Sequence, residues 1–378
     1  MKTEVYLYED GRWDKELDKT LDSKSTLIIV YGSTNFSQIK DGFDQLKNNF
    51  PNSTIVGNST SGEIYNDELY EHTLTLAIIK FEKTKIKTIS TTVENPEQSY
   101  QSGISIAKQL EDEKLKSIFI LSDGLNVNGS QLTKGINSVF KNNILVTGGL
   151  AGDDANFSNT WTLLNDEPKS KQVVAVGFYG DDINVAYGSQ GGWTKFGIDR
   201  VVTKSNSNVV YEIDGKPALE VYKTYLGDSV KDLPLSGLYY PLMIQEDSNS
   251  DEEKVRTILS VNEDDQSITF AGDIPSGSKA MFMKASFEQL VDGASNAVGK
   301  MVLSKYKDQD ALNIAISCVG RKLVLGQKTE DEIEAVYQQF GDNVKQIGFY
   351  SYGEISPLES GSCDLHNQTM TLTMMWES

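Results

Sequence analysis

Cys318 and His366 are the pair of side chains that can support nucleophilic catalysis, with a thiolate as the nucleophile and an imidazole as its base. Arg321 lies close to Cys318 in the chain, and its charge can lower the pKa of a thiol. The simpler expectation is that Cys318 fills apolar space, because free cysteine is among the most buried residue types. His366 is also a candidate haem or metal ligand, although a lone histidine in a turn before a strand is a weak signal. We expect neither residue to be catalytic.

Other common catalytic and cofactor-binding patterns do not occur in the sequence. There is no phosphate-binding P-loop, dinucleotide fingerprint opening a helix, His-Glu-x-x-His zinc motif, Gly-x-Ser-x-Gly elbow or kinase signature set. Because the chain has 2 histidines, a multi-histidine metal site is excluded. Asp153 and Asp154 lack the alternating partners of a calcium loop, so Asp153 is expected to be a turn or cap residue. We therefore expect no resident cofactor.

Three glycine-containing turns are stronger candidates for a binding site. Gly57–Ile64, Gly148–Ala155 and Gly348–Ile355 follow equivalent predicted strands, and they would converge if those units packed around a common axis. Glycine lets the backbone approach a ligand closely; the alternative is that these glycines only satisfy tight turns. The expected ligand-binding residues are Arg321, Cys318, Gly320, Tyr352, Gly353, Glu354, Glu63, Gly62, Gly149 and Asp153.

Arg321 is expected to hold the anionic end of the ligand. It follows a predicted strand by one glycine, which places it at the carboxyl edge of the sheet, where open α/β sheets bind ligands. A guanidinium can grip a carboxylate with two parallel hydrogen bonds. Glu63 and Glu354 would then face an ammonium group, which would suit an amino acid. The alternative is a structural ion pair between Arg321 and one of these glutamates.

The residues around Arg321 form a strand–helix–strand unit. The apolar, β-branched run Leu312–Val319 predicts a buried strand. Thr329, followed three positions later by Glu332, predicts a capping box, and apolar residues then recur at helical spacing. Lys345–Tyr352 predicts the next strand, which ends in the third glycine turn.

The same order of elements occurs twice more upstream. The first strands of these copies are Thr26–Tyr31 and Ser117–Leu121, and the second strands are Ser53–Gly57 and Asn143–Thr147. A fixed order of elements over about 55–65 residues is the mark of an internal repeat, although strand–helix alternation is itself common. The sequence thus predicts an α/β protein of mixed β-sheets flanked by helices, built from strand–helix–strand pseudo-repeats in two domains.

Length and composition set the remaining expectations. The 378 residues suit two domains, 1–215 and 216–378. A formal net charge of −19 opposes binding to nucleic acid or to an anionic membrane surface. No apolar run approaches the ~20 residues of a membrane span, and residues 1–20 have no signal-peptide pattern. We expect a cytoplasmic protein in which Cys318 and Cys363 are free thiols.

Several stretches together resemble the FIST family. Those that look like its C-terminal domain are Cys318–Arg321, Gly348–Ile355 and His366–Leu372. Those that look like its N-terminal domain are Gly57–Ile64, Gly148–Asp153, Gly192–Trp193 and Val201–Thr203. The resemblance covers nearly the whole chain, and the ordered set is more specific than any one of these short motifs.

The resemblance implies a sensory, ligand-binding module of signal transduction that binds small molecules such as amino acids. Some members of the family are associated with haem and nitric-oxide sensing, and relatives are often fused to output domains that this chain is not expected to contain. We therefore expect a cytoplasmic small-molecule sensor without catalysis, which binds an amino acid or a similar small anion or zwitterion and acts through a separate signalling output protein. The alternatives are a cysteine- and histidine-dependent enzyme and a haem-bound gas sensor.

Overall fold

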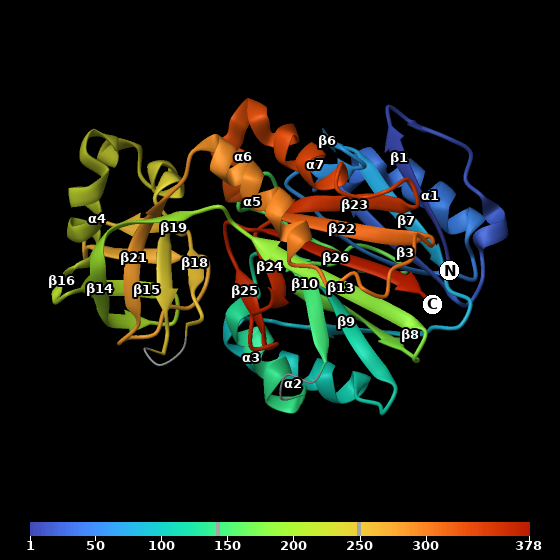
Figure 1. The fold of residues 1–378 in the computed structure, drawn as a ribbon, viewed down its shortest axis with the longest axis horizontal. Coiled ribbons are helices and arrows are strands. Elements are labelled where there is room, and N and C mark those ends of the chain that lie inside the picture. Colours follow the sequence, from blue (N-terminus) through green and yellow to red (C-terminus); the bar gives the residue numbers. More distant parts are fainter. Residues whose placement is uncertain (141–143, 248–250) are drawn as a thin grey trace.

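The computed structural model describes residues 1–140, 144–247 and 251–378. A large body contains three six-stranded sheets, and a smaller body beside it contains an eight-stranded sheet (Figure 1). Both chain termini lie on the large body, where the N-terminal ammonium of Met1 is 3.0 Å from the Glu377 carboxylate. Among the described residues, no helix is both long and apolar enough to cross a membrane.

The large body is built from three copies of one unit, as the sequence predicts. Each copy has a central strand, a parallel neighbour on one side and an antiparallel neighbour on the other. The first copy comprises β3 (Thr26–Gly32), α1 (Phe36–Asn49), β4 (Thr54–Ser59) and β7 (Leu74–Lys80). The second comprises β9 (Leu115–Ser122), α3 (Gly129–Phe140), β10 (Leu145–Leu150) and β12 (Gln172–Tyr179). The third comprises β22 (Ala311–Cys318), α6 (Val319–Leu325), α7 (Thr329–Tyr337), β23 (Val344–Ser351) and β26 (Met370–Glu377). The predicted strand start at Asn143 lies outside the described residues.

The sequence explains these elements locally. Every residue of the central strands β3 and β22 is buried, which matches their continuous apolar runs. Helix α1 begins after Asn35, whose side chain accepts a hydrogen bond from the backbone N–H of Ser37. The buried residues Ile39, Phe43 and Leu46 recur at helical spacing and pack α1 onto its sheet.

The three copies exchange strands in a ring. From the first copy, β5 (Glu63–Tyr65) pairs with β23 of the third and carries β6 (Glu68–Tyr70) with it. From the third copy, β24 (Gly353–Pro357) pairs with β10 of the second and carries β25 (Cys363–His366). From the second copy, β11 (Thr162–Leu164) pairs with β4 of the first. The outer strands are β1 (Lys2–Glu9) with β2 (Arg12–Trp13), β8 (Lys85–Thr92) and β13 (Ile183–Gln190). This cyclic exchange of strands joins the three copies into one body.

A glycine at the same place in each copy brings adjacent strands close together. Gly57, Gly148 and Gly348 each lie opposite the central strand of their own copy. An added Cβ would lie 2.4, 1.9 and 1.8 Å from the carbonyl oxygens of Val30, Ile120 and Ala315, respectively. A side chain at any of these positions would therefore push two strands apart.

The small body is inserted between β13 and α5 (Phe287–Gly299) of the large body. Its strands are β14 (Thr194–Asn206), β15 (Val209–Ile213), β16 (Lys216–Pro217), β17 (Leu242–Gln245), β18 (Lys254–Arg256), β19 (Ile258–Asn262), β20 (Ser267–Phe270) and β21 (Lys279–Lys284). Helix α4 (Ala218–Leu226) packs on this sheet through residues such as Leu219 and Tyr222. Helix α2 (Ser99–Leu110) precedes the second copy, and α5 precedes the third.

The predicted division at residues 215 and 216 falls between β15 and β16. These two strands pair with each other within the small body. The domain boundary predicted from the sequence therefore does not coincide with the boundary between the two bodies. The eight-stranded sheet of the small body contains strands from both sides of residue 215.

The predicted capping box at Thr329 is wrong. Thr329 is the first residue of α7, and no side chain caps that helix. The Thr329 hydroxyl instead donates to the carbonyl of Gly326 at 2.6 Å. Glu332 points inward and pairs with Arg321, because leaving a buried guanidinium unpaired costs more free energy than leaving the helix without a side-chain cap.

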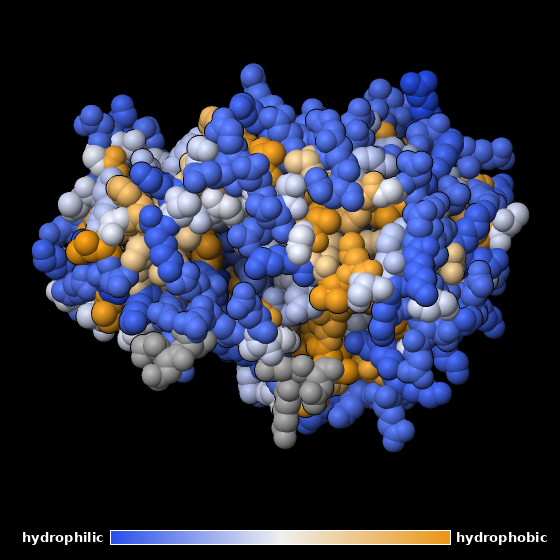
Figure 2. All heavy atoms as spheres, in the orientation of Figure 1, coloured by the Kyte–Doolittle hydropathy of each residue, from blue (hydrophilic) through white to orange (hydrophobic). Residues whose placement is uncertain are grey.

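Hydrophilic side chains cover most of the face seen in Figure 2, as the net charge of −19 leads one to expect. Apolar residues gather in the middle of the large body, around the strands labelled β13 and β9 in Figure 1. A cavity of about 540 Å³ lies between the two bodies, with Tyr187 of β13 on one side and Met243 of β17 on the other.

Candidate functional site

The three glycine turns meet at one place, which confirms the predicted convergence. The N–H of Ser61 in the first turn donates to the carbonyl of Tyr350 in the third at 2.9 Å. The N–H of Gly152 in the second turn donates to the carbonyl of Ser59 at 3.0 Å. Tyr352 completes the ring by donating its N–H to Leu150 at 3.2 Å. Strand exchange thus brings together turns that lie far apart in the sequence.

A polar cavity of about 780 Å³ opens beside this junction, and all three copies contribute to its lining. The first copy supplies the segment 33–38 after β3, the turn with Gly62 and Glu63, and then Glu71 and His72. The second supplies Asp153, Asp154, Asn156, Asn159 and Trp161, and the third supplies Lys322. Gly62, Glu63 and Asp153 are members of the predicted site, whereas Lys322, Glu71, His72 and Asn156 were not predicted.

Helix α1 opens onto the cavity with its N-terminus. Asn35, Phe36 and Ser37 line the cavity, and the first turn of the helix carries no acidic residue. The positive end of the helix dipole favours an anionic group at this position.

Lys322 organises another part of the cavity lining. Its ammonium donates to the carbonyl of Ser61 at 2.8 Å, to Glu71 at 2.5 Å and to Asp154 at 3.1 Å. Three acceptors use the three donors of a lysine. Lys322 therefore holds two carboxylates in place, and their side chains are still 51% and 49% exposed. An ammonium group can be bound at this carboxylate-rich wall.

Glu63 and Glu354 occupy matching places in the first and third copies. Glu63 accepts hydrogen bonds from the backbone N–H and hydroxyl of Thr73 at 3.0 and 2.9 Å. Glu354 does the same with Thr369 at 3.2 and 2.8 Å. Burial raises the pKa of Glu63 to about 7 and the pKa of Glu354 to about 8. Both side chains clamp their turns to the strand that follows.

These two carboxyls predict how stability depends on pH. Because their folded-state pKa values lie above the ordinary value of 4.5, their contribution to stability is complete at low pH and is lost as the pH rises through 7 and 8. The free energy of unfolding should fall between about pH 4.5 and 8 and level off above, and it should fall less steeply in a Glu63→Gln, Glu354→Gln variant. Urea unfolding at each pH measures both slopes. An equal slope in the double variant would contradict the assignment.

Asp153 organises the second turn rather than facing a ligand freely. Its carboxylate accepts hydrogen bonds from the backbone N–H groups of Phe157, Ser158 and Asn159 at 2.9, 2.7 and 2.8 Å. It also accepts one from the hydroxyl of Tyr352. The predicted role of Asp153 as a turn residue therefore agrees with its geometry.

Arg321 is fully buried, and its five N–H groups all have acceptors within the protein. The guanidinium makes two hydrogen bonds to Glu332, at 3.0 and 2.6 Å. It also donates to the carbonyls of Gly191, Leu290 and Gln368 at 2.6, 2.8 and 3.3 Å. No donor remains for a ligand carboxylate. The structural ion pair that was the alternative is present, but its partner is Glu332 rather than Glu63 or Glu354.

The remaining predicted residues lie on the other side of the junction. Cys318, Gly320 and Tyr352 line a separate apolar cavity. Gly149 and Gly353 lie in the β10–β24 pair, where Gly149 is opposite Glu354. The sequence therefore identified residues of two cavities and of the strands between them, and combined them into one site.

Cys318 is buried in an environment that keeps it a thiol. Burial raises its pKa to about 12, so a thiolate is not formed near neutral pH. Cys318→Ala should keep the fold and cost about 1–2 kcal/mol of stability. A thiol reagent at pH 7.5 should label Cys318 only after unfolding, as read by mass spectrometry of the labelled peptide. Rapid labelling of the folded protein would contradict this description.

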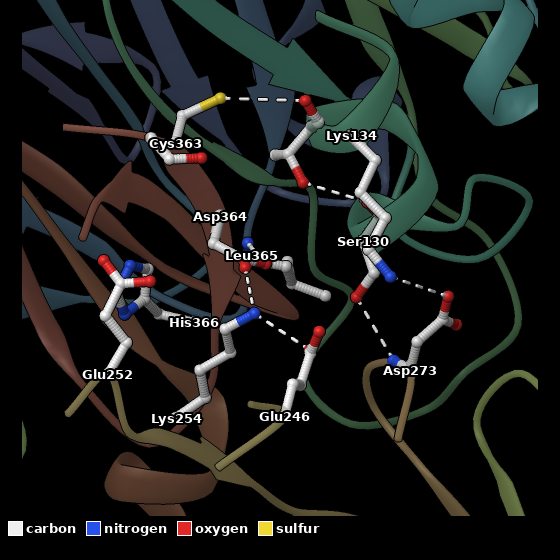
Figure 3. A network of polar contacts seen from close by, with 12 residues as sticks. Ser130, Lys134, Glu246, Glu252, Lys254, Asp273, Cys363, Asp364, Leu365 and His366 are labelled. Atoms are coloured by element: carbon white, nitrogen blue, oxygen red, sulfur yellow. Dashed lines mark hydrogen bonds and ion pairs between the residues drawn. The ribbon is translucent and has the colours of Figure 1, made fainter. Parts of the chain in front are cut away.

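His366 lies at the junction of the two bodies, within the polar network of Figure 3. Its Nε2 is 2.9 Å from the carbonyl of Ser356, and burial lowers its pKa. Beside it, Lys254 of the small body pairs with Asp364 and with Glu246, the latter at 2.9 Å. The His366 ring contacts the Ser356 carbonyl rather than the Cys318 thiol, and the two residues line different cavities.

Comparisons with known proteins agree with the resemblance seen in the sequence. The FIST N domain model matches residues 26–216 and the FIST C domain model matches residues 218–357. The chain belongs to the FIST family, whose domains are thought to be small-ligand-binding sensor domains in signal transduction. The boundary between the two matched segments, at residues 216 and 218, lies close to the predicted division at residues 215 and 216.

One curated relative and two solved structures show how far the similarity extends. The uncharacterised protein MJ1623 of Methanocaldococcus jannaschii is 24% identical over 390 residues, covering 90% of this chain and 71% of that protein. A chorismatase structure covers 99% of this chain and 98% of its own, with a TM-score of 0.37 and 8% identity. A cyanuric acid hydrolase from A. caulinodans covers 100% and 99%, with a TM-score of 0.38 and 6% identity. These two structural likenesses are too distant to define a shared site.

Proposed function

We propose that this protein is a small-molecule-binding sensor of signal transduction and that its ligand site is the polar cavity beside the three glycine turns. The observation that carries the proposal is the convergence of all three copies on one cavity of about 780 Å³. Cavities of this size with a few convergent polar groups are the usual form of ligand sites.

The distribution of charge favours a zwitterion such as an amino acid. The N-terminus of α1 offers the positive end of the helix dipole to a carboxylate. Glu71 and Asp154, held by Lys322, offer acceptors to an ammonium group. A purely anionic ligand would meet these two carboxylates, so the zwitterion is the better match.

The proposed role does not include catalysis. The separation of Cys318 from His366 and the raised pKa of the thiol support a binding function. The protein would then signal ligand binding to a separate output protein in the cytoplasm.

Native mass spectrometry followed by calorimetry tests the proposal. Freshly purified protein should carry a small molecule, or should bind one from a panel of amino acids with a stoichiometry of one per chain. Glu71→Gln and Asp154→Asn should each weaken binding by about tenfold, the loss of one charge-assisted contact of roughly 1.4 kcal/mol. Lys328→Met, which removes an exposed lysine outside the cavity lining, is the control. If both carboxylate variants bound the ligand with the affinity of the wild type, the ligand would have to bind elsewhere.

A further inference from the structure

The apolar cavity of about 320 Å³ lies where the two bodies meet. Leu125, Val127 and Leu150 of the second copy form one wall, Val319 and Leu323 of α6 form another, and Leu238 and Ile258 of the small body close it. None of the described residues that line this cavity carries a charge. In a chain with a net charge of −19, such a lining sets this cavity apart.

Large apolar side chains around this cavity are left open to solvent. Leu235 is 63% exposed, Phe157 is 51% exposed, Leu323 is 43% exposed and Leu259 is 38% exposed. Scattered exposed apolar residues are ordinary, but a group of them around one concave site is typical of a binding site. An apolar molecule in the cavity would remove part of this surface from water.

An aromatic pair lies in the lining. The rings of Phe157 and Tyr352 are stacked with centroids 4.8 Å apart and an angle of 17° between their planes. A flat ring in the cavity could extend this stack, because offset stacking is a preferred arrangement of aromatic rings. The absence of charged groups from the described lining selects against an ionised ligand, which would lose its hydration without a partner.

One short segment belongs to both cavities. Asp153, Asp154 and Asn156 line the polar cavity, whereas Ala155 and Phe157 line the apolar one. Asp154, Ala155 and Phe157 have φ angles of 58°, 59° and 49°, in the left-handed region that residues with side chains seldom occupy. The carboxylate of Asp153 holds this conformation through its hydrogen bonds to the backbone and to Tyr352. The segment 153–157 therefore joins the linings of the two cavities.

We propose that the apolar cavity is a second ligand site, for an uncharged small molecule with a flat ring, and that the segment 153–157 couples its occupancy to that of the polar cavity. The existence of the second site is independent of the proposed function, whereas the coupling rests on it. If occupancy of one cavity changes the affinity of the other, the reverse change has the same factor.

The neutral fluorescent compound 1-aminoanthracene is a suitable probe for the second site. It should bind the whole protein with a stoichiometry of one, and Leu235→Glu and Leu323→Glu should each weaken binding at least tenfold. Both positions are exposed, so the fold should survive, and circular dichroism checks this. Ile198→Glu is the matched control, because Ile198 is also 63% exposed on the small body but does not line the cavity. Failure to bind, or equal binding by all variants, would overturn the second site.

The coupling is tested by repeating the probe titration with the amino acid that binds the polar cavity. The affinity for the probe should change at least fivefold. Tyr352→Phe keeps the ring stack but loses the hydroxyl contact with Asp153, so it should bind the probe and show a reduced change. Equal probe affinity with and without the bound amino acid would overturn the coupling. Probe binding that depends on Leu235 and Leu323, in a protein that binds no amino acid, would support the second site and reject the proposed zwitterion site.

Discussion

Arg321→Met is expected to lower the free energy of unfolding by about 3–5 kcal/mol, because it leaves the buried Glu332 carboxylate without its cation. The same change also removes donors from the carbonyls of Gly191, Leu290 and Gln368. Arg321 thereby ties α5 and the segments next to β13 and β26 to α6. Chemical unfolding followed by circular dichroism measures the loss.

Two further variants separate the ion pair from general damage. Removing both partners in Arg321→Met, Glu332→Leu should recover part of the stability, because a buried pair replaced by apolar groups is often tolerated. Arg200→Met, which breaks a partly exposed pair with Asp214, should cost about 1 kcal/mol or less. A loss at Arg321 no greater than that at Arg200 would show that the guanidinium is not essential to the fold.

Gly348→Ala is expected to cost about 2–3 kcal/mol or more, because its Cβ would lie 1.8 Å from the carbonyl oxygen of Ala315 and must force two core strands apart. Gly57→Ala and Gly148→Ala should be affected in the same direction, since their positions are equivalent. Thermal unfolding of the three variants compares them directly.

Gly299→Ala is the matched control for the three glycine variants. Gly299 is the last residue of α5, and nothing lies within 4 Å of an added Cβ. Its replacement should leave stability unchanged or raise it by up to about 1 kcal/mol. If Gly348→Ala left the stability unchanged, the close contact between the two strands would not constrain the three copies.

The repeated unit was predictable from sequence because each copy carries its own signals. Apolar runs, helical spacing and a glycine turn follow one another within each copy, and local chemistry determines all three. The exchange of β5, β11 and β24 between copies was not predictable, because strand pairing depends on which edges meet in space. The grouping of the strands of the small body into one sheet was not predictable for the same reason.

The candidate site was predicted in part for similar reasons. Gly62, Glu63 and Asp153 belong to the turns, and the turns converge. Arg321 was assigned to the ligand because it follows a strand, yet burial made it the partner of Glu332 instead. Lys322, the next residue, was not predicted to belong to the site because lysine is usually a solvated surface residue. Only the packing of α6 against the first and second turns gives Lys322 its place in the cavity.

Asn35 offers the most direct test of the proposed zwitterion site. It caps α1 and lines the polar cavity close to where the ligand carboxylate should bind. Asn35→Asp preserves the cap, since aspartate is an equally good N-cap residue, but adds a negative charge there. Asn35→Ser preserves the cap without the charge and is the control. Neither change should impair folding.

The measurement is a calorimetric titration of the wild type and both variants with the preferred amino acid and with its amide, which lacks the carboxylate. Binding of the amino acid should weaken about tenfold or more in Asn35→Asp, which corresponds to about 1.4 kcal/mol, and should change little in Asn35→Ser. Binding of the amide, which presents no negative charge to the new aspartate, should not weaken in Asn35→Asp. Equal affinity of the amino acid for all three proteins would contradict a ligand carboxylate at the N-terminus of α1, and with it the proposed site.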